Sequence, residues 1–372
     1  MKPAPRIYFL DNLRAFVIIL VVVLHGSITY MAFAPSWWYV LDPQNSLFFT
    51  ALVLLIDVPI MLILFFIAGY FVFPSLAKRD ARTFLRDKFV RVGLPWLGGA
   101  LLLAPPTAYI IYYSRQVPMS FWEFWTTDFW GVAYQQSVYW FLGILFLLFL
   151  IVTLAYAASR RFRELGPKQS APSWTLFGPF LAYTTIGFLT LNLIFPLDTW
   201  THAGYLFMFQ PLRVPLYVGY FALGIYAYLH GWFTTRGYGP RLIVWLPLFL
   251  GSGLLYLAYR FTIPAETQTT VVLKAGNALL FNTFCLSSLM VGLALFQRYL
   301  NGISLFWRSQ AVNSYGIYYV HPLILYPLAL LFVSISLPLV VKAPLVIVLA
   351  LLLSWAFSAL ILKKVPPLNR VF

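Results

Sequence analysis

Residues 8–31, with the sequence YFLDNLRAFVIILVVVLHGSITYM, decide the fold of this chain. Residues 15–24 are all apolar, Asp11 and Arg14 stand near the start of the stretch, and His25 follows the apolar run. A helix that crosses a bilayer needs about 20 mostly apolar residues, so we predict a membrane-spanning helix here. At about 1.5 Å rise per residue, His25 lies roughly 16 Å beyond Arg14, near the middle of the bilayer.

The depth of His25 makes it a candidate functional residue. An ionisable side chain inside a membrane is costly to retain and usually faces a pathway or a site. The alternative is a polar group that a neighbouring helix satisfies. The position of the residue alone does not separate the two interpretations.

The whole chain has the composition of a membrane protein. Of its 372 residues, 62% are apolar and only 9% are charged, which excludes a soluble globular domain. We expect a single transmembrane domain over residues 1–372 and no fused soluble domain. The one cysteine, Cys285, excludes an internal disulfide, and the absence of metal-type Cys/His spacing leads us to expect no metal. The net charge of +15 does not indicate nucleic acid, because the distribution of Lys and Arg matters more in such a protein.

Apolar runs bounded by charge, Pro or Gly predict ten spans, and the charges between them predict an orientation. The spans cover about residues 13–33, 47–73, 92–113, 138–158, 174–195, 206–229, 241–261, 271–296, 311–334 and 339–362. Of the 25 Lys and Arg residues, 20 fall in loops and termini on one side. By the positive-inside rule that side is cytoplasmic, together with both termini. The predicted fold class is an all-α polytopic membrane protein with about ten transmembrane helices.

Three sequence motifs resemble a known family. Arg14 is separated from His25 by ten residues and lies in the run LDNLRA of residues 10–15, and residues 65–71 (FFIAGYF) and 91–95 (RVGLP) follow in order. This layout resembles acyltransferase family 3, bacterial envelope enzymes that move acetyl, succinyl or other short acyl groups onto glycans. Within the family it is most similar to the periplasmic glucan succinyltransferase branch, the glucan biosynthesis protein C type.

The resemblance implies a catalytic role for His25. A neutral imidazole in a low-dielectric site can accept the proton of a sugar hydroxyl while that oxygen attacks a thioester. We predict that His25 is the general base, and an acylated His25 remains an alternative. Asp11 is a further catalytic candidate, although Asp11 and Arg14 are three residues apart on a helix and can simply form an ion pair.

The resemblance also implies a donor site for acyl-CoA on the cytoplasmic side. Residues 84–95 (FLRDKFVRVGLP) resemble the basic pair that the family carries before a proline, but Lys88 stands where the family usually has Arg. Lysine supplies a point charge rather than a bidentate fork. We predict that Arg14, Arg86, Lys88 and Arg91 bind the CoA phosphates. The alternative is a lipid-facing basic cluster that only sets the topology.

A further motif lies late in the chain. Residues 313–322 (NSYGIYYVHP) resemble a family motif in which Ser-Tyr-x-x-Tyr precedes a histidine, here His321. Counted from Ala311, His321 is roughly 15 Å into the bilayer, close to the expected depth of His25. We predict that the two histidines share a cavity, with Tyr315 and Tyr318 near the substrate. The alternative is that Pro322 breaks the helix and His321 satisfies the freed backbone groups.

Two further residues are candidates for substrate contact. Asp57 lies inside the second span, where it would be a natural partner for a membrane histidine or for Arg213. Trp140 opens a Trp-Phe-Leu run that resembles another family marker, and its alternative role is an interfacial anchor. The outer loops are rich in Trp and Tyr, which interfacial anchoring mostly explains.

The sequence therefore predicts a bacterial inner-membrane O-acyltransferase with acyl-CoA as donor and an envelope or periplasmic glycan as acceptor. Membrane lipids and the glycan are its expected partners, nucleic acid is not, and a homodimer is compatible with the sequence. A different class remains open, namely a transporter or flippase that uses the same membrane His, Asp and Arg residues without covalent chemistry.

Overall fold

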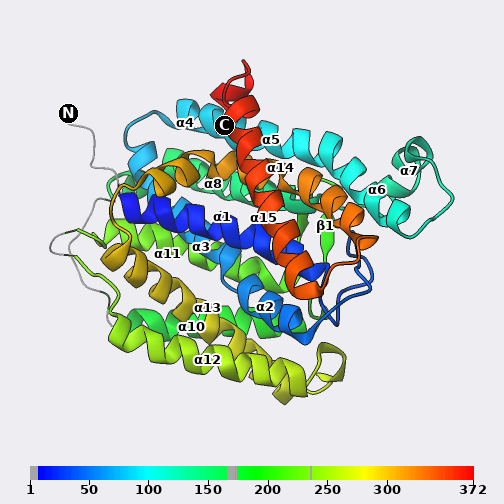
Figure 1. Ribbon diagram of the computed structural model, residues 1–372. Coiled ribbons are helices and arrows are strands. Elements are labelled where there is room, and N and C mark those ends of the chain that lie inside the picture. Colours follow the sequence, from blue (N-terminus) through cyan, green and yellow to red (C-terminus); the bar gives the residue numbers. More distant parts are fainter. Residues whose placement is uncertain (1–6, 166–171, 173, 235–236) are drawn as a thin grey trace.

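The computed structural model describes residues 7–165, 172, 174–234 and 237–372, and within them the chain is a bundle of long helices with one β-hairpin (Figure 1). The helices are α1 (Tyr8–Ile28), α2 (Leu47–Asp57), α3 (Ile60–Leu76), α4 (Ala81–Lys88), α5 (Leu94–Gly98), α6 (Ala104–Ser114), α7 (Phe121–Thr126), α8 (Trp140–Ala158), α9 (Arg160–Arg163), α10 (Trp174–Asn192), α11 (Val214–Leu229), α12 (Leu242–Thr262), α13 (Val271–Tyr299), α14 (Leu305–Val333) and α15 (Leu339–Phe357). The strands are β1 (Thr201–Ala203) and β2 (Phe207–Phe209), which pair antiparallel.

Nine helical segments in the described part of the chain are long and apolar enough to cross a membrane. They correspond to nine of the ten predicted spans. The remaining prediction, residues 174–195, coincides with the 19-residue helix α10, which packs along α11 and α13. The all-α, multi-pass membrane fold is therefore confirmed. Four basic residues that entered the orientation argument, Lys2, Arg6, Lys168 and Arg236, lie outside the described residues.

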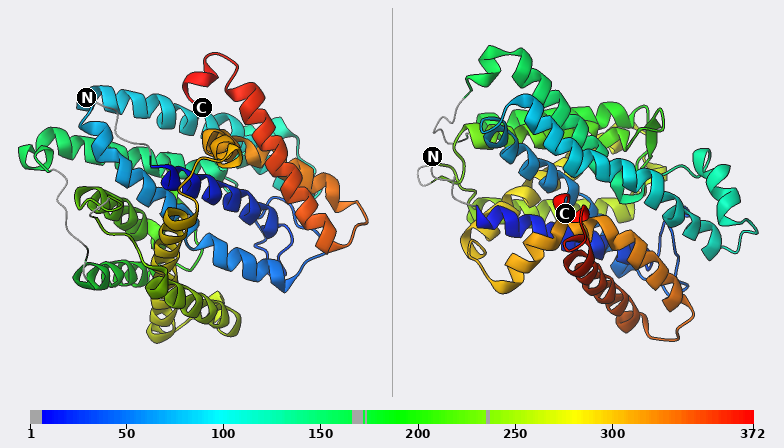
Figure 2. Two further views of the ribbon diagram at one scale, coloured as in Figure 1. Left: turned by 60° about the vertical axis from the view of Figure 1, so that its left-hand side comes forward. Right: turned by 90° about the horizontal axis from the view of Figure 1, so that it is seen from above.

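Helix α1 lies at the centre of the bundle, where it contacts α2, α3, α13, α14 and α15 (Figures 1 and 2). The predicted bounds of 13–33 are wrong by about five residues, since the helix runs from Tyr8 to Ile28. Asp11 belongs to its first turn, where a carboxylate is favourable, and pairs with Arg14 one turn on. His25 consequently lies in the last turn of α1 rather than at its middle.

The second predicted span is two helices, because α2 ends at Asp57 and α3 begins at Ile60. Pro59 has no N–H to donate, so it cannot make the hydrogen bond to the carbonyl of Leu55 that would continue α2. The break brings Asp57 to the end of a helix inside the bundle. Helix α3 then packs against α11 so closely that a Cβ atom on Gly69 would lie 2.0 Å from the backbone oxygen of Phe221.

The third predicted span starts earlier than expected. A single helical segment runs over Ala81–Ser114 and includes two π-helical turns, Phe89–Gly93 and Gly99–Leu103. Arg86 and Lys88 are therefore helical residues, and Arg91 lies within the first π turn, a feature that is frequent at functional sites. The basic cluster is part of this helix and not a loop before it.

His25 lies at the C-terminal end of α1, and the loops around this end form a cap. The sixth predicted span starts at Pro211 rather than 206, because residues 201–209 form the β1–β2 hairpin. This hairpin packs against α8. Together with residues 29–46 and 131–139, it encloses the site described below.

Candidate active site

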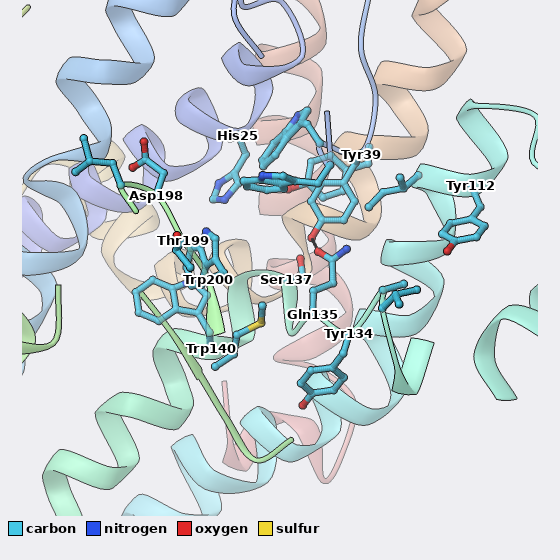
Figure 3. A pocket seen from close by; sticks show the side chains of 18 residues that line it. His25, Tyr39, Tyr112, Tyr134, Gln135, Ser137, Trp140, Asp198, Thr199 and Trp200 are labelled. Carbon is cyan, nitrogen blue, oxygen red and sulfur yellow. Dashed lines mark hydrogen bonds between the residues drawn. The ribbon is translucent and has the colours of Figure 1, made fainter. Parts of the chain in front are cut away.

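A cavity of about 630 Å³ lies under this cap, and His25 forms part of its wall (Figure 3). It is lined by His25, Trp37, Trp38, Tyr39, Ile111, Tyr112, Val132, Ala133, Tyr134, Gln135, Ser137, Trp140, Leu197, Asp198, Thr199, Trp200, Met208 and Tyr326. Aromatic rings and neutral polar groups dominate this lining. No Lys or Arg is among these lining residues, and Asp198 is the only carboxylate.

The backbone fixes the orientation and the tautomer of His25. Its Nδ1 lies 2.7 Å from the carbonyl oxygen of Val21, one turn earlier in α1. Because a carbonyl only accepts hydrogen bonds, Nδ1 carries the proton and Nε2 of the neutral ring is an acceptor. The ring stacks on Trp38, with centroids 5.7 Å apart, and it points toward the cavity (Figure 3).

His321 lies beside His25, with ring centroids 5.1 Å apart. It is completely buried on α14, which continues through Pro322 rather than breaking there. Pro322 has no N–H for the carbonyl of Tyr318, and His321 Nδ1 donates to that oxygen at 2.7 Å. Nε2 has no hydrogen-bond partner among the described residues. His321 thus satisfies a freed backbone group and also keeps an unprotonated nitrogen near His25. It does not line the cavity, so the prediction that the two histidines share it is wrong, although their rings are neighbours.

Residues 29–46 form the loop that brings Trp38 to His25, and α6 holds this loop from one side. The Arg115 guanidinium donates to the carbonyl oxygens of Ser36 at 2.6 Å and Trp38 at 2.8 Å. Ser114 donates to the carbonyl oxygen of Tyr39 at 2.9 Å. The position of the Trp38 ring therefore depends on the end of the helical segment Ala81–Ser114.

A buried ion pair holds the same loop from the other side. Lys342 Nζ on α15 lies 3.1 Å from Asp42 Oδ2, and both side chains are at most 2% exposed. Tyr39, between these anchors, donates to Gln135 Oε1 at 2.5 Å. Burial raises the pKa of the Tyr39 hydroxyl, so it remains a protonated donor.

Asp57 pairs with Arg213 and not with a histidine. The Arg213 guanidinium donates to the carboxylate of Asp57 and, at 3.2 Å, to its backbone oxygen. Arg213 also lies over the ring of Phe281 at 5.4 Å. Neither Asp57 nor Arg213 lines the cavity. The pair joins the break between α2 and α3 to the start of α11.

Asp11 lies fourteen positions before His25 on one continuous helix, about 21 Å along its axis. Its carboxylate pairs with Arg14 at 3.1 Å. Arg14 in turn lies 3.5 Å from the carbonyl oxygen of Ala311 on α14. Asp11 therefore forms the ion pair that its spacing from Arg14 allowed, and it does not line the cavity as a catalytic residue would.

The predicted donor residues also lie far from the cavity. Arg86 and Arg91 are exposed, while Lys88 Nζ sits 4.5 Å from the ring centroid of Phe149. Ile111, on the same helical segment, lines the cavity and is twenty residues, or about 30 Å, beyond Arg91. The basic residues and the cavity thus occupy opposite ends of this segment.

Of the three aromatic residues expected near the substrate, only Trp140 lines the cavity. Trp140 lines the cavity, with its ring centroid 5.2 Å from that of Trp200. Tyr315 and Tyr318 are not among the lining residues. Tyr315 donates to the carbonyl oxygen of Arg91 at 2.7 Å, and Tyr318 donates to that of Val138. Their hydroxyls tie α14 to neighbouring elements instead of facing the cavity.

Several lining residues were not predicted from the sequence because they belong to no recognisable motif, and all but Tyr326 of α14 lie outside the long helices. They are Tyr134, Gln135, Ser137, Thr199, Trp200 and Tyr326. The one available signal was the short distance in sequence from Tyr134–Ser137 to the Trp-Phe-Leu run at Trp140. Their convergence depends on how three loops fold over the end of α1.

Comparisons with known proteins place the chain in a family. A family model described as an acyltransferase domain, that of acyltransferase family 3, matches residues 7–359. The chain is similar to "Glucans biosynthesis protein C" of Salmonella schwarzengrund (strain CVM19633), with 26% identity over 275 residues that cover 69% of this chain and 66% of the relative. The proteins of the same name from Salmonella typhi and Salmonella typhimurium are 25% identical over the same shares.

The match thus spans just under two thirds of the length of these relatives. No solved structure matches the chain. The family match covers nearly all of the chain, including the bundle, the cap and both histidines. The chain belongs to acyltransferase family 3.

Proposed function

We propose that this multi-pass membrane protein is a bacterial inner-membrane O-acyltransferase with two separate substrate sites. It moves a short acyl group, acetyl or succinyl, from cytoplasmic acyl-CoA to a hydroxyl of an envelope or periplasmic glycan. The observation that carries the proposal is His25, whose Nδ1 is held by the Val21 carbonyl while the ring faces a large cavity. This arrangement offers an unprotonated Nε2 to an incoming hydroxyl.

The cavity suits a neutral glycan better than it suits CoA. Its volume of about 630 Å³ lies in the range of small-molecule sites. Rings of Trp37, Trp140 and Trp200 offer apolar faces for sugar rings, and Gln135 and Thr199 offer hydrogen bonds to hydroxyls. A lining without Lys or Arg gives no counter-charge for phosphates. The word glucans in the name of the Salmonella relatives agrees with this choice of acceptor.

The basic residues at the other end of the bundle suit the donor. Arg14 and Arg91 both contact the first turns of α14, through Ala311 and Tyr315 respectively. His321 follows Ala311 by ten residues on the same helix, about 15 Å. CoA phosphates bound near Arg14 and Arg91 would direct the thioester along α14 toward the two histidines.

The reaction needs one base near the meeting point of the two substrates. His25 Nε2 takes the proton of the glycan hydroxyl as its oxygen attacks the thioester carbonyl carbon. Collapse of the tetrahedral intermediate breaks the carbon–sulfur bond, and the imidazolium returns the proton to the CoA thiolate. His321 lies 5.1 Å away between ring centroids and positions the substrate or shares the proton.

Thermal unfolding of the detergent-solubilised protein tests the donor site. A ligand that binds only the folded state raises its stability by about 2.7 kcal/mol at a hundredfold excess over Kd. We expect CoA, acetyl-CoA or succinyl-CoA to raise the Tm of the wild type and not that of Arg91→Ala. Arg82→Ala is the matched control. Arg82 is also an exposed arginine of the Ala81–Ser114 segment, nine residues before Arg91, and this variant should keep the shift in Tm. No shift with any of these compounds, for a folded wild type, would contradict the proposal.

A further inference from the structure

One tyrosine in the cavity wall differs from the others in its hydrogen bonding. Four tyrosines line the cavity. Tyr39 donates to Gln135, Tyr112 donates to Asp128 at 2.8 Å, and Tyr134 donates to the backbone oxygen of Tyr205. The hydroxyl of Tyr326 is buried and has no hydrogen-bond partner among the described residues. Tyr326 is therefore the one member of this set whose donor is unused.

The surroundings of Tyr326 connect it to His25. Its ring stacks on that of Tyr39, with centroids 3.9 Å apart and planes 15° apart, and meets Trp38 edge-on at 5.5 Å. Trp38 stacks on His25. Tyr326 is also five residues beyond His321 on α14, about 7.5 Å along the helix. Tyr39 and Trp38 thus hold the ring of Tyr326 in place, and Trp38 contacts both this ring and that of His25.

A buried hydroxyl without a partner is unfavourable, and phenylalanine would avoid that cost with the same ring. Tyr30 shows that an unpartnered hydroxyl alone does not make a site, since it is equally buried and does not line the cavity. What distinguishes Tyr326 is an unused donor in the wall that holds the proposed base.

We propose that the Tyr326 hydroxyl donates a hydrogen bond to the oxyanion of the acyl-transfer reaction, an inference that rests on the proposed function. As the glycan oxygen bonds to the thioester carbon and its proton passes to His25, the carbonyl π electrons move onto oxygen. Tyr326 stabilises that negative charge until the carbonyl re-forms and the CoA thiolate leaves with the proton from His25. A donor aimed at developing charge in a water-poor site is one of the larger contributions to catalysis.

Two matched tyrosine variants test the assignment, with acyl transfer to glucose trisaccharides as the assay. Tyr326→Phe should lower kcat by roughly 10²–10³, the loss typical for one oxyanion donor, with little change in KM. Its Tm should be unchanged or higher, because the variant removes an unsatisfied buried group. Tyr30→Phe removes an equally buried and unpartnered hydroxyl away from the cavity, and it should keep the wild-type kcat.

The outcomes separate this role from the function itself. A Tyr326→Phe variant with wild-type kcat would overturn the role of Tyr326 while leaving the transferase intact. A loss of kcat that comes with a clear fall in Tm would also overturn it, because the hydroxyl would then support the fold. Absence of transfer by the wild-type protein would overturn the proposed function and this role together.

Discussion

At His25 and His321 the backbone decides which ring nitrogen carries the proton. Each Nδ1 donates to a carbonyl of its own helix, Val21 in one case and Tyr318 in the other. Each Nε2 is then an acceptor, and a hydroxyl or an acid could use it. The same bond also anchors the ring, so the local and the catalytic explanations of these histidines are compatible.

Two substitutions can test the roles of the two ring nitrogens of His321 one at a time. In His321→Asn the side-chain amide can still donate to the Tyr318 carbonyl, but Nε2 is lost, so we expect a folded protein with lower kcat. In His321→Gln the amide lies near the Nε2 position and the Tyr318 carbonyl loses its partner, at a cost of about 1–3 kcal/mol in unfolding free energy. Acyl-transfer kinetics and denaturation in detergent measure the two effects. Equal stability of the two variants would contradict the assignment.

Sequence motifs singled out His25 and Trp140, which both line the cavity, and the matched depths of the two histidines predicted that His321 lies near His25. They failed for Asp11, because the motif does not show that helical rise keeps it about 21 Å from His25. They also did not decide whether Asp57 pairs with a histidine or with Arg213, because that choice depends on how the helices pack. Tyr326 and Gln135 carry no sequence signal, since their importance comes from loops and helices that meet in space.

Among the elements, the loop over residues 29–46 does most to shape the site. It carries Trp38 onto His25 and Tyr39 onto Gln135. Arg115 binds it from α6 and Lys342 binds it from α15. Hydrogen bonds within the loop, such as Asp42 N–H to the Thr29 carbonyl, add to these two charged anchors.

Removal of the Lys342 charge should therefore disturb both stability and catalysis. Lys342→Met leaves Asp42 buried and unpaired, and breaking such a pair costs about 3–5 kcal/mol. Lys274→Met is the matched control, because the one hydrogen bond of Lys274 to the described residues goes to the backbone oxygen of Asn192, at 2.8 Å. Chemical denaturation in detergent measures both variants. A cost for Lys342→Met no larger than that for Lys274→Met would show that the pair does not anchor the loop.

The hydropathy pattern predicted which segments are membrane-spanning helices, but it did not predict where each helix begins and ends. Long apolar runs identified the spanning helices, because a bilayer imposes their length. The charged start of α1 and of the Ala81–Ser114 segment extended those helices beyond the apolar runs. The break before Pro59 and the β1–β2 hairpin arise from local backbone limits and from packing on α8.

On the scale of the whole molecule, the predicted donor residues and the aromatic cavity lie at opposite ends of the bundle. Arg86, Lys88 and Arg91 lie near the start of the Ala81–Ser114 segment, and Ile111 and Tyr112 at its far end line the cavity. The positive-inside rule predicts that the basic end is cytoplasmic. The cavity would then open away from the cytoplasm.

Cysteine labelling can test this orientation, because the single cysteine is buried. In a Cys285→Ala background, Val132→Cys places a thiol at a site that is 92% exposed, and Arg82→Cys places one at the opposite end. A membrane-impermeant maleimide added to spheroplasts should label the first variant and not the second. The reverse pattern would mean that the basic end faces outward.

The most direct test of the account is acyl transfer by purified protein in liposomes, followed by mass spectrometry of glucose trisaccharides after incubation with acetyl-CoA or succinyl-CoA. The wild type should yield an acylated sugar. His25→Asn should yield none, while its Tm stays near that of the wild type because the amide can keep the bond to the Val21 carbonyl. A His25→Asn protein that transfers acyl groups at the wild-type rate would contradict the central role of His25.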